Sequence, residues 1–126
     1  MNTDNKKNEL SPRELGETIV KILDAKKAKD IKLLRIDDKT VLADYFVICG
    51  GNSNTQVRAL AGEVEDKLEE MELKPHHIEG YNEATWTVLD YSSVIVHIFN
   101  RETREFYKLE KLWSDAENID ISALLI

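Results

Sequence analysis

The chain of 126 residues has a single cysteine, Cys49, and only two prolines. One cysteine excludes an internal disulfide and a cysteine-rich zinc site. Because Cys49 ends an apolar run, we expect a buried thiol of the core and not a reactive one. No apolar run approaches the roughly 20 residues of a membrane-spanning helix, and the first eight residues lack the apolar segment of a secretory signal. We therefore expect a cytoplasmic protein with no membrane partner.

The chain is also short of positive charge, since 17 lysines and arginines face 24 aspartates and glutamates, for a net charge of −7. A broad phosphate-binding surface needs clustered basic side chains, so we expect no large contact with nucleic acid. An acidic surface suits a basic protein as partner. The length and a hydrophobic content of 42% predict one globular domain.

The pattern of polar and apolar residues predicts the order of helices and strands. Residues 1–10 are mostly polar and are expected to be disordered. Ser11 and Glu14 form a capping box around Pro12, which predicts a helix to about Lys27. Strands are predicted at 31–36 and 44–49, followed by a helix from Ser53 that ends before Pro75. Three further strands are predicted at 77–79, 85–91 and 94–99. A last helix from about Arg101 places Phe106, Leu109 and Trp113 on one stripe.

This order predicts an α/β (α+β) fold, a mixed five-stranded sheet with three main helices. The domain spans residues 11–115, and residues 116–126 form an apolar C-terminal tail that packs on the domain or on a partner. Helices mainly on one face would leave apolar sheet surface for a partner or a second copy. Alternation along the hairpin places Trp86 and Asp90 on one face and Tyr91 on the other.

Two groups of polar residues suggest chemistry. Gly50-Gly51-Asn52-Ser53 joins a strand to a helix, where backbone amides can hold an anion, but no lysine follows the glycines as in a Walker loop. We interpret it as a turn in which Ser53 caps the helix, because a nucleotidyltransferase also needs paired carboxylates on the next strand, which offers only Glu79. A metal site from His77, Glu79 and His97 is less well supported than a hydrogen-bonded His97 in the core or at an interface. We expect no catalytic residue, cofactor or metal ion.

Several stretches together resemble ribosomal silencing factors of the Iojap family. They are Asp44-Tyr45-Phe46-Val47-Ile48, Gly51-Asn52-Ser53, Glu79-Gly80, residues 86–91, residues 96–99 and residues 104–113. The likeness covers residues 12–115, and the spacing from Glu79 to Trp113 fits without gaps. Ser92-Ser93, Thr103 and Cys49-Gly50 depart from the usual pattern but leave the function intact.

The resemblance implies a nucleotidyltransferase-like fold without catalytic carboxylates. Family members bind large-subunit ribosomal protein fourteen where the small subunit docks, block subunit joining and repress translation. The resemblance places the partner-binding region, with its immediate support, at Trp86, Asp90, Tyr91, His97, Phe99, Tyr107, Glu110 and Trp113. In this region we expect Trp86 and Tyr91 to be aromatic anchors. Asp90 and Glu110 are expected to contact basic side chains of the ribosomal protein. Arg104 is expected to form an ion pair with an acidic neighbour that holds its helix.

Two other hypotheses stay open. One is a nucleotidyltransferase-like enzyme or nucleotide-binding protein, with magnesium and nucleotide near Ser53 and Asp44. The other is an oligomerisation module whose sheet face pairs with itself. A homodimer in solution is expected for a silencing factor as well, and ribosomal RNA is expected at the rim of the contact at most.

Overall fold

The computed structural model describes residues 10–126, so the prediction of disorder for residues 1–10 lies outside the described part of the chain except at Leu10, where it was wrong because this side chain packs on the core. A mixed sheet of six strands, in the order β3-β4-β5-β2-β1-β6, forms the centre. The strands are β1 (Lys29–Arg35), β2 (Tyr45–Gly51), β3 (His77–Glu79), β4 (Trp86–Asp90), β5 (Val94–Asn100) and β6 (Glu117–Asn118). Strands β2 and β5 are parallel, and the other neighbours are antiparallel. The predicted mixed sheet is confirmed, with the two-residue β6 as an additional edge strand.

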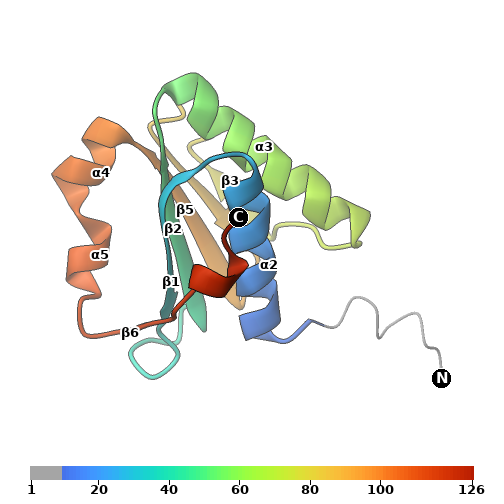
Figure 1. Cartoon of the computed structure of the whole chain (residues 1–126), viewed down its shortest axis with the longest axis vertical. Coiled ribbons are helices and arrows are strands. Elements are labelled where there is room, and N and C mark those ends of the chain that lie inside the picture. The colour runs from blue at the N-terminus through green and yellow to red at the C-terminus, as the bar shows by residue number, and fades with distance from the viewer. Residues whose placement is uncertain (1–9) are drawn as a thin grey trace.

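The helices form a layer on each side of this sheet (Figure 1). The long helices α2 (Pro12–Ala25) and α3 (Asn54–Glu70) cover one face, while the short helices α4 (Arg101–Tyr107) and α5 (Leu109–Leu112) lie on the other side. A one-turn 3-10 helix, η1 (Ser122–Leu124), lies near the C-terminus. None of the helices within residues 10–126 is both long and apolar enough to cross a membrane.

Both long helices begin at the caps that the sequence predicts. The Ser11 hydroxyl accepts a 3.0 Å hydrogen bond from the Glu14 amide, and the Glu14 carboxylate accepts a 2.9 Å bond from the Ser11 amide. At α3 the Ser53 hydroxyl accepts a 3.1 Å bond from the Gln56 amide. The Gln56 side chain accepts a bond from the amide of Asn52, one residue before the cap, so α3 lacks the complete capping box of α2. At each helix start the capping hydroxyl nevertheless satisfies one of the free amides.

Strand β2 divides the apolar interior into two clusters. All seven of its residues are buried. Tyr45, Val47 and Cys49 face α2 and α3, whereas Phe46 and Ile48 face α4 and α5. The prediction of a central strand covered on both faces is confirmed. Cys49 has no exposed surface, and burial raises its pKa to about 12, as expected for a core thiol.

The third predicted helix is broken, so the prediction of one continuous stripe was wrong. Lys108 adopts a left-handed conformation, with φ 50° and ψ 52°, between α4 and α5. The break turns the chain, and Leu109 is consequently buried while Phe106 is 79% exposed. Lysine is a good helix former, so the sequence carries no local signal for this break.

The C-terminal tail packs on its own domain. Ile119 and Ile121 are buried in the cluster beneath α2, and the Ile119 amide donates a 2.9 Å hydrogen bond to the carbonyl of Leu33. Leu10, from the start of the described chain, packs on the same cluster. Both ends of the described chain thus add to one core.

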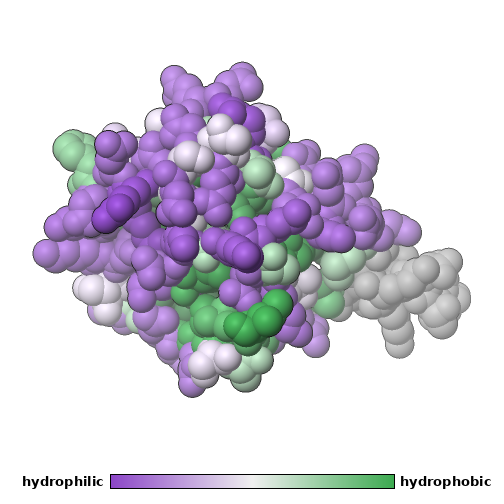
Figure 2. All heavy atoms as spheres, turned by 45° about the horizontal axis from the view of Figure 1, so that its top comes forward, coloured by the Kyte–Doolittle hydropathy of each residue, from purple (hydrophilic) through white to green (hydrophobic). Residues whose placement is uncertain are grey.

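Figure 2 shows one face of the molecule, on which hydrophilic side chains surround a smaller apolar area.

Candidate functional site

Aromatic rings gather on the sheet face that α4 and α5 only partly cover. We call the set of Phe46, Trp86, His97, Phe99, Tyr107 and Trp113 the aromatic face. The ring centroids are 4.7 Å apart for Phe46 and His97, 4.8 Å for Trp86 and Phe99, and 5.0 Å for Trp86 and Tyr107. Edge-to-face and offset ring contacts of this kind stabilise a rigid surface beyond the area that they bury.

Strand pairing explains why these rings meet. Trp86 on β4 pairs with Phe99 on β5, and His97 lies two residues before Phe99 on the same side. Phe46 on β2, the next strand, contributes the ring on the other side of His97. The stretch that contains α5 then brings Trp113 over Phe46, with ring centroids 5.3 Å apart. Residues from three strands and the C-terminal helices therefore build one cluster.

His97 is neutral in this cluster. The indole nitrogen of Trp86 donates a 3.2 Å hydrogen bond to Nδ1 of His97, and His97 is only 8% exposed. Burial lowers the His97 pKa to about 4. The expectation of a hydrogen-bonded His97 is confirmed, and its function here is to orient Trp86.

Beside the aromatic face, the α4–α5 region exposes large apolar side chains. Phe106 is 79% exposed, Leu112 75% and Tyr107 52%. The rings of Phe106 and Tyr107 contact each other, and Tyr107 continues to Trp86. We call Phe106, Tyr107 and Leu112 the exposed edge. Exposed apolar side chains that adjoin a rigid aromatic cluster are typical of protein-docking surfaces.

The ion pair of Arg104 and Glu110 holds this region onto the sheet. Nε and Nη2 of Arg104 lie 3.0 and 2.9 Å from Oε2 of Glu110. The same guanidinium donates to the carbonyls of Lys29, at 3.2 Å, and Asp30, at 2.8 Å, where a register shift interrupts β1. Burial opposes ionisation of Glu110, but hydrogen bonds and the charges of Arg104 and Lys32 outweigh it, so its pKa is lowered. The predicted ion pair of Arg104 is confirmed.

The predicted contact residues separate into four places. Trp86, His97, Phe99, Tyr107 and Trp113 come together on the aromatic face. Glu110 lies nearby but is engaged by Arg104. Asp90 lies at the other end of β4, where its carboxylate accepts a 2.8 Å bond from the Ser92 amide.

Tyr91 is on the opposite side of the sheet. It is 8% exposed and belongs to the core cluster under α2 and α3. Burial raises its pKa, and the Glu65 carboxylate on α3 adds to the shift. In this structure Tyr91 can therefore support the hairpin but offers little surface to a partner.

Sequence reasoning missed Phe46, Phe106 and Leu112 as members of this surface. Phe46 lies in a run of apolar residues, and a uniformly buried strand does not reveal which side chains share a face with Trp86. Phe106 and Leu112 lie on the two sides of the break at Lys108, and both are exposed. A signal for Phe46 was its spacing of two from Ile48, which marks one side of β2.

The other chemical candidates do not assemble. His77 and Glu79 contact each other at 2.7 Å on β3, with 57% and 66% of their side chains exposed, while His97 is buried on β5 beyond β4. Within residues 10–126 no three histidine, cysteine or acidic side chains are grouped to hold a metal ion. Asp44 precedes β2 and Ser53 follows it, so seven strand residues, about 23 Å, separate them. One magnesium–nucleotide site cannot include both.

Comparison with known proteins gives the family. The family model described as "Ribosomal silencing factor during starvation" matches residues 9–125. The chain belongs to this family. The silencing factor of Halalkalibacterium halodurans is 36% identical over 116 residues, 92% of this chain and 99% of the relative. That of Bacillus subtilis is 43% identical over 98 residues, 78% of this chain and 83% of the relative.

The fold agrees with this silencing factor family. A crystal structure of a Chromobacterium violaceum protein matches with a TM-score of 0.81 and 29% identity, covering 90% of this chain and 93% of the other. The resemblance to silencing factors of the Iojap family and the mixed α/β fold are therefore both confirmed.

Proposed function

We propose that this silencing factor binds the large ribosomal subunit through large-subunit ribosomal protein fourteen, with the exposed edge as its docking surface and the mostly buried aromatic face as its support. By occupying the face where the small subunit docks, it blocks subunit joining in the cytoplasm and represses translation without any turnover chemistry. The supporting observation is that Phe106 and Tyr107 are exposed directly beside a packed aromatic cluster.

The chemistry of the surface fits a protein partner. A standard interface buries about 1,600 Å² in total, and few side chains in it supply most of the binding energy. Tyr107 is the best candidate for such a residue, because its ring is half exposed and rests on Trp86. Glu102 and Glu105 are exposed on α4 and are available to basic side chains of the partner, whereas Glu110 is engaged by Arg104. Contact with ribosomal RNA would be confined to the rim.

The deciding experiment is co-sedimentation with purified large subunits, followed by a subunit-joining assay. We compare the unmodified chain with Tyr107→Ala and with Tyr81→Ala as a matched control, since Tyr81 is an exposed tyrosine next to α3 on the other side of the sheet. Stoichiometric binding and loss of joining are expected for the unmodified chain and for Tyr81→Ala. Tyr107→Ala should weaken binding by about tenfold or more.

Trp86→Ala extends the test to the rigid part of the surface. Because Trp86 packs on Phe99 and bonds to His97, this variant must keep the circular dichroism spectrum of the folded protein before its binding defect counts. Absence of binding by the unmodified chain, or equal defects in Tyr107→Ala and Tyr81→Ala, would contradict the proposal.

The same exposed edge also suits a homodimer in the absence of ribosomes. One apolar surface can serve both uses, since a second copy would cover what the ribosomal protein covers. Light scattering should then give twice the monomer mass for the unmodified chain, and Phe106→Asp should shift it to the monomer. A monomeric unmodified chain at about 100 μM would remove the dimer from the proposal but leave ribosome binding intact.

A further inference from the structure

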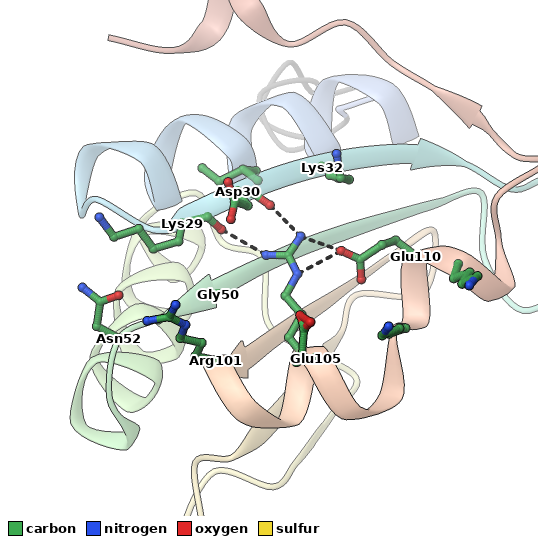
Figure 3. Close-up of a pocket in the computed structure, with 13 residues that line it drawn as sticks. Lys29, Asp30, Lys32, Gly50, Asn52, Arg101, Glu105 and Glu110 are labelled. Carbon is green, nitrogen blue, oxygen red and sulfur yellow. Dashed lines mark hydrogen bonds and ion pairs between the residues drawn. The ribbon is translucent and has the colours of Figure 1, made fainter.

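A basic cleft lies between the start of β1, the end of β2 and the α4–α5 region (Figure 3). Its volume is about 780 Å³, within the range of small-molecule sites. Six basic side chains line it: Lys29, Lys32, Arg101, Arg104, Lys108 and Lys111. Only Asp30, Glu105 and Glu110 oppose them, so the cleft has an excess of positive charge in a chain whose net charge is −7.

Four of these cations are free to meet a ligand, and a fifth, Lys32, interacts with Glu110 only through its charge. Arg104 is engaged by Glu110 and by two backbone carbonyls, and this arrangement fixes the floor of the cleft. Among the described residues, no carboxylate lies within ion-pair distance of the other five basic side chains. Lysines and arginines that come from separate segments repel one another in a concave site, and an anion would relieve that repulsion.

Gly50 and Gly51 at the end of β2 line one wall of the cleft with backbone only. A Cβ at Gly50 would lie at contact distance, 3.4 Å, from Nη1 of Arg104, whereas one at Gly51 would point at Val57 on α3. Figure 3 shows the Lys29, Asn52 and Arg101 side chains at the end of the cleft where β2 leads into α3. Polar groups from three separate segments therefore converge at this end.

We propose that this cleft binds a small ligand that carries two or more linked phosphate groups. Several cations around one concave site match the charge of an oligophosphate better than that of a single phosphate. The lining contains no aromatic ring and only one aliphatic side chain, Ile31, so it has no surface on which a nucleobase could stack. Recognition is consequently by phosphate and not by base. The proposal does not depend on ribosome binding.

Calorimetric titration of the full chain with tripolyphosphate, at about 0.15 M salt, tests this directly. We expect saturable binding of one tripolyphosphate per chain, weaker binding of pyrophosphate and little binding of orthophosphate. ATP should bind within about threefold of tripolyphosphate, because the cleft offers nothing to the base. In NMR spectra of the same titration, the amides of Gly50, Gly51 and Asn52 should shift together.

Charge-matched variants distinguish a site from general attraction. Arg101→Gln should weaken tripolyphosphate binding by about tenfold or more, whereas Lys74→Gln, which removes the same single charge at an exposed lysine after α3, should change it by less than about twofold. The melting temperature of each variant is measured first to show that it is folded. Absence of saturable binding, or an equal loss in Lys74→Gln, would overturn the proposal. So would a twelve-nucleotide RNA that binds more tightly than tripolyphosphate and shifts the same amides, since the site would then be one for an RNA backbone.

Discussion

The indole nitrogen of Trp86 and Nδ1 of His97 are joined by a 3.2 Å hydrogen bond across β4 and β5. An indole N–H can only donate, so Nδ1 must accept and the imidazole proton must be on Nε2. Nε2 is buried and has no hydrogen-bond partner in the described part of the chain. The pair is therefore compatible only with neutral His97, in agreement with its lowered pKa of about 4.

The first prediction concerns pH. In the unfolded chain His97 has a pKa of about 6.5, so between about pH 6.5 and pH 4 the unfolded state binds a proton that the native state does not. The contribution of His97 to stability is complete above pH 6.5 and is lost as the pH falls toward 4. We expect it to reduce the free energy of unfolding by about 2 kcal/mol between pH 7.5 and pH 5, measured by urea denaturation.

His97→Asn provides the control for this prediction, because it removes the titrating group while the exposed His76 and His77 remain. The variant should be less stable at pH 7.5, and its stability should change much less between pH 7.5 and pH 5. Equal pH dependence in the two proteins would show that other groups cause the effect.

The second prediction concerns Arg104. Its guanidinium bonds to Glu110 and to the carbonyls of Lys29 and Asp30, and its side chain is only 14% exposed. Arg104→Met should lower the free energy of unfolding by about 2 kcal/mol, because it leaves those acceptors without their donor. Arg104→Lys should recover little of this loss, since one ammonium group cannot reach all three acceptors.

A double-mutant cycle with Glu110→Gln, followed by urea denaturation, isolates the ion pair. The coupling energy between Arg104 and Glu110 should be about 1 kcal/mol, since both side chains are partly buried. A coupling energy near zero would mean that Arg104 acts through the two carbonyls alone.

The third prediction concerns the break between α4 and α5. Lys108 has φ 50°, a conformation that glycine adopts without the steric cost that a side chain incurs. Lys108→Gly should therefore leave the fold unchanged and raise the free energy of unfolding by about 0.5 kcal/mol. Lys108→Val, with its branched Cβ, should lower it by about 1 kcal/mol. Two variants of equal stability would show that the backbone is not left-handed at this position.

The fourth prediction concerns Cys49. It has no exposed surface and its pKa is raised to about 12 by burial, so the native protein holds almost no thiolate at neutral pH. A thiol-specific chromogenic reagent should react with the folded protein at least about a hundredfold more slowly than with the protein in urea. Rapid labelling without denaturant would show that β2 opens locally.

Much of the fold could be predicted because its signals are local. The capping box at Ser11, the buried run of β2 and the two alternating strands of the hairpin each depend on a few neighbouring residues. The break at Lys108 could not be predicted, because it arises where Leu109 packs on the sheet and Arg104 reaches β1. Strand β6 has only two residues, and it is a strand because these residues pair with Leu34 and Arg35 of β1.

The residues of the candidate docking surface were likewise predicted only in part. Alternation correctly separated Tyr91 from Trp86, so the two proposed anchors could not share a face. Aromatic residues at 86, 97, 99, 107 and 113 do meet, but the contact of Phe46 with His97 depends on β2 pairing with β5. Strand order is set by packing between segments far apart in the chain, and a local pattern does not contain it.

The amino-acid sequence by itself therefore determined the elements, the faces of the hairpin strands and the membership in a family. Each of these follows from spacing between neighbours, from side-chain alternation or from matched motifs. Only the tertiary structure decided which apolar side chains remain exposed and which charges share a cleft. Lys29, Gly50 and Arg104 lie far apart in the sequence and meet because β1, β2 and α4 pack together, and that packing is a property of the whole chain.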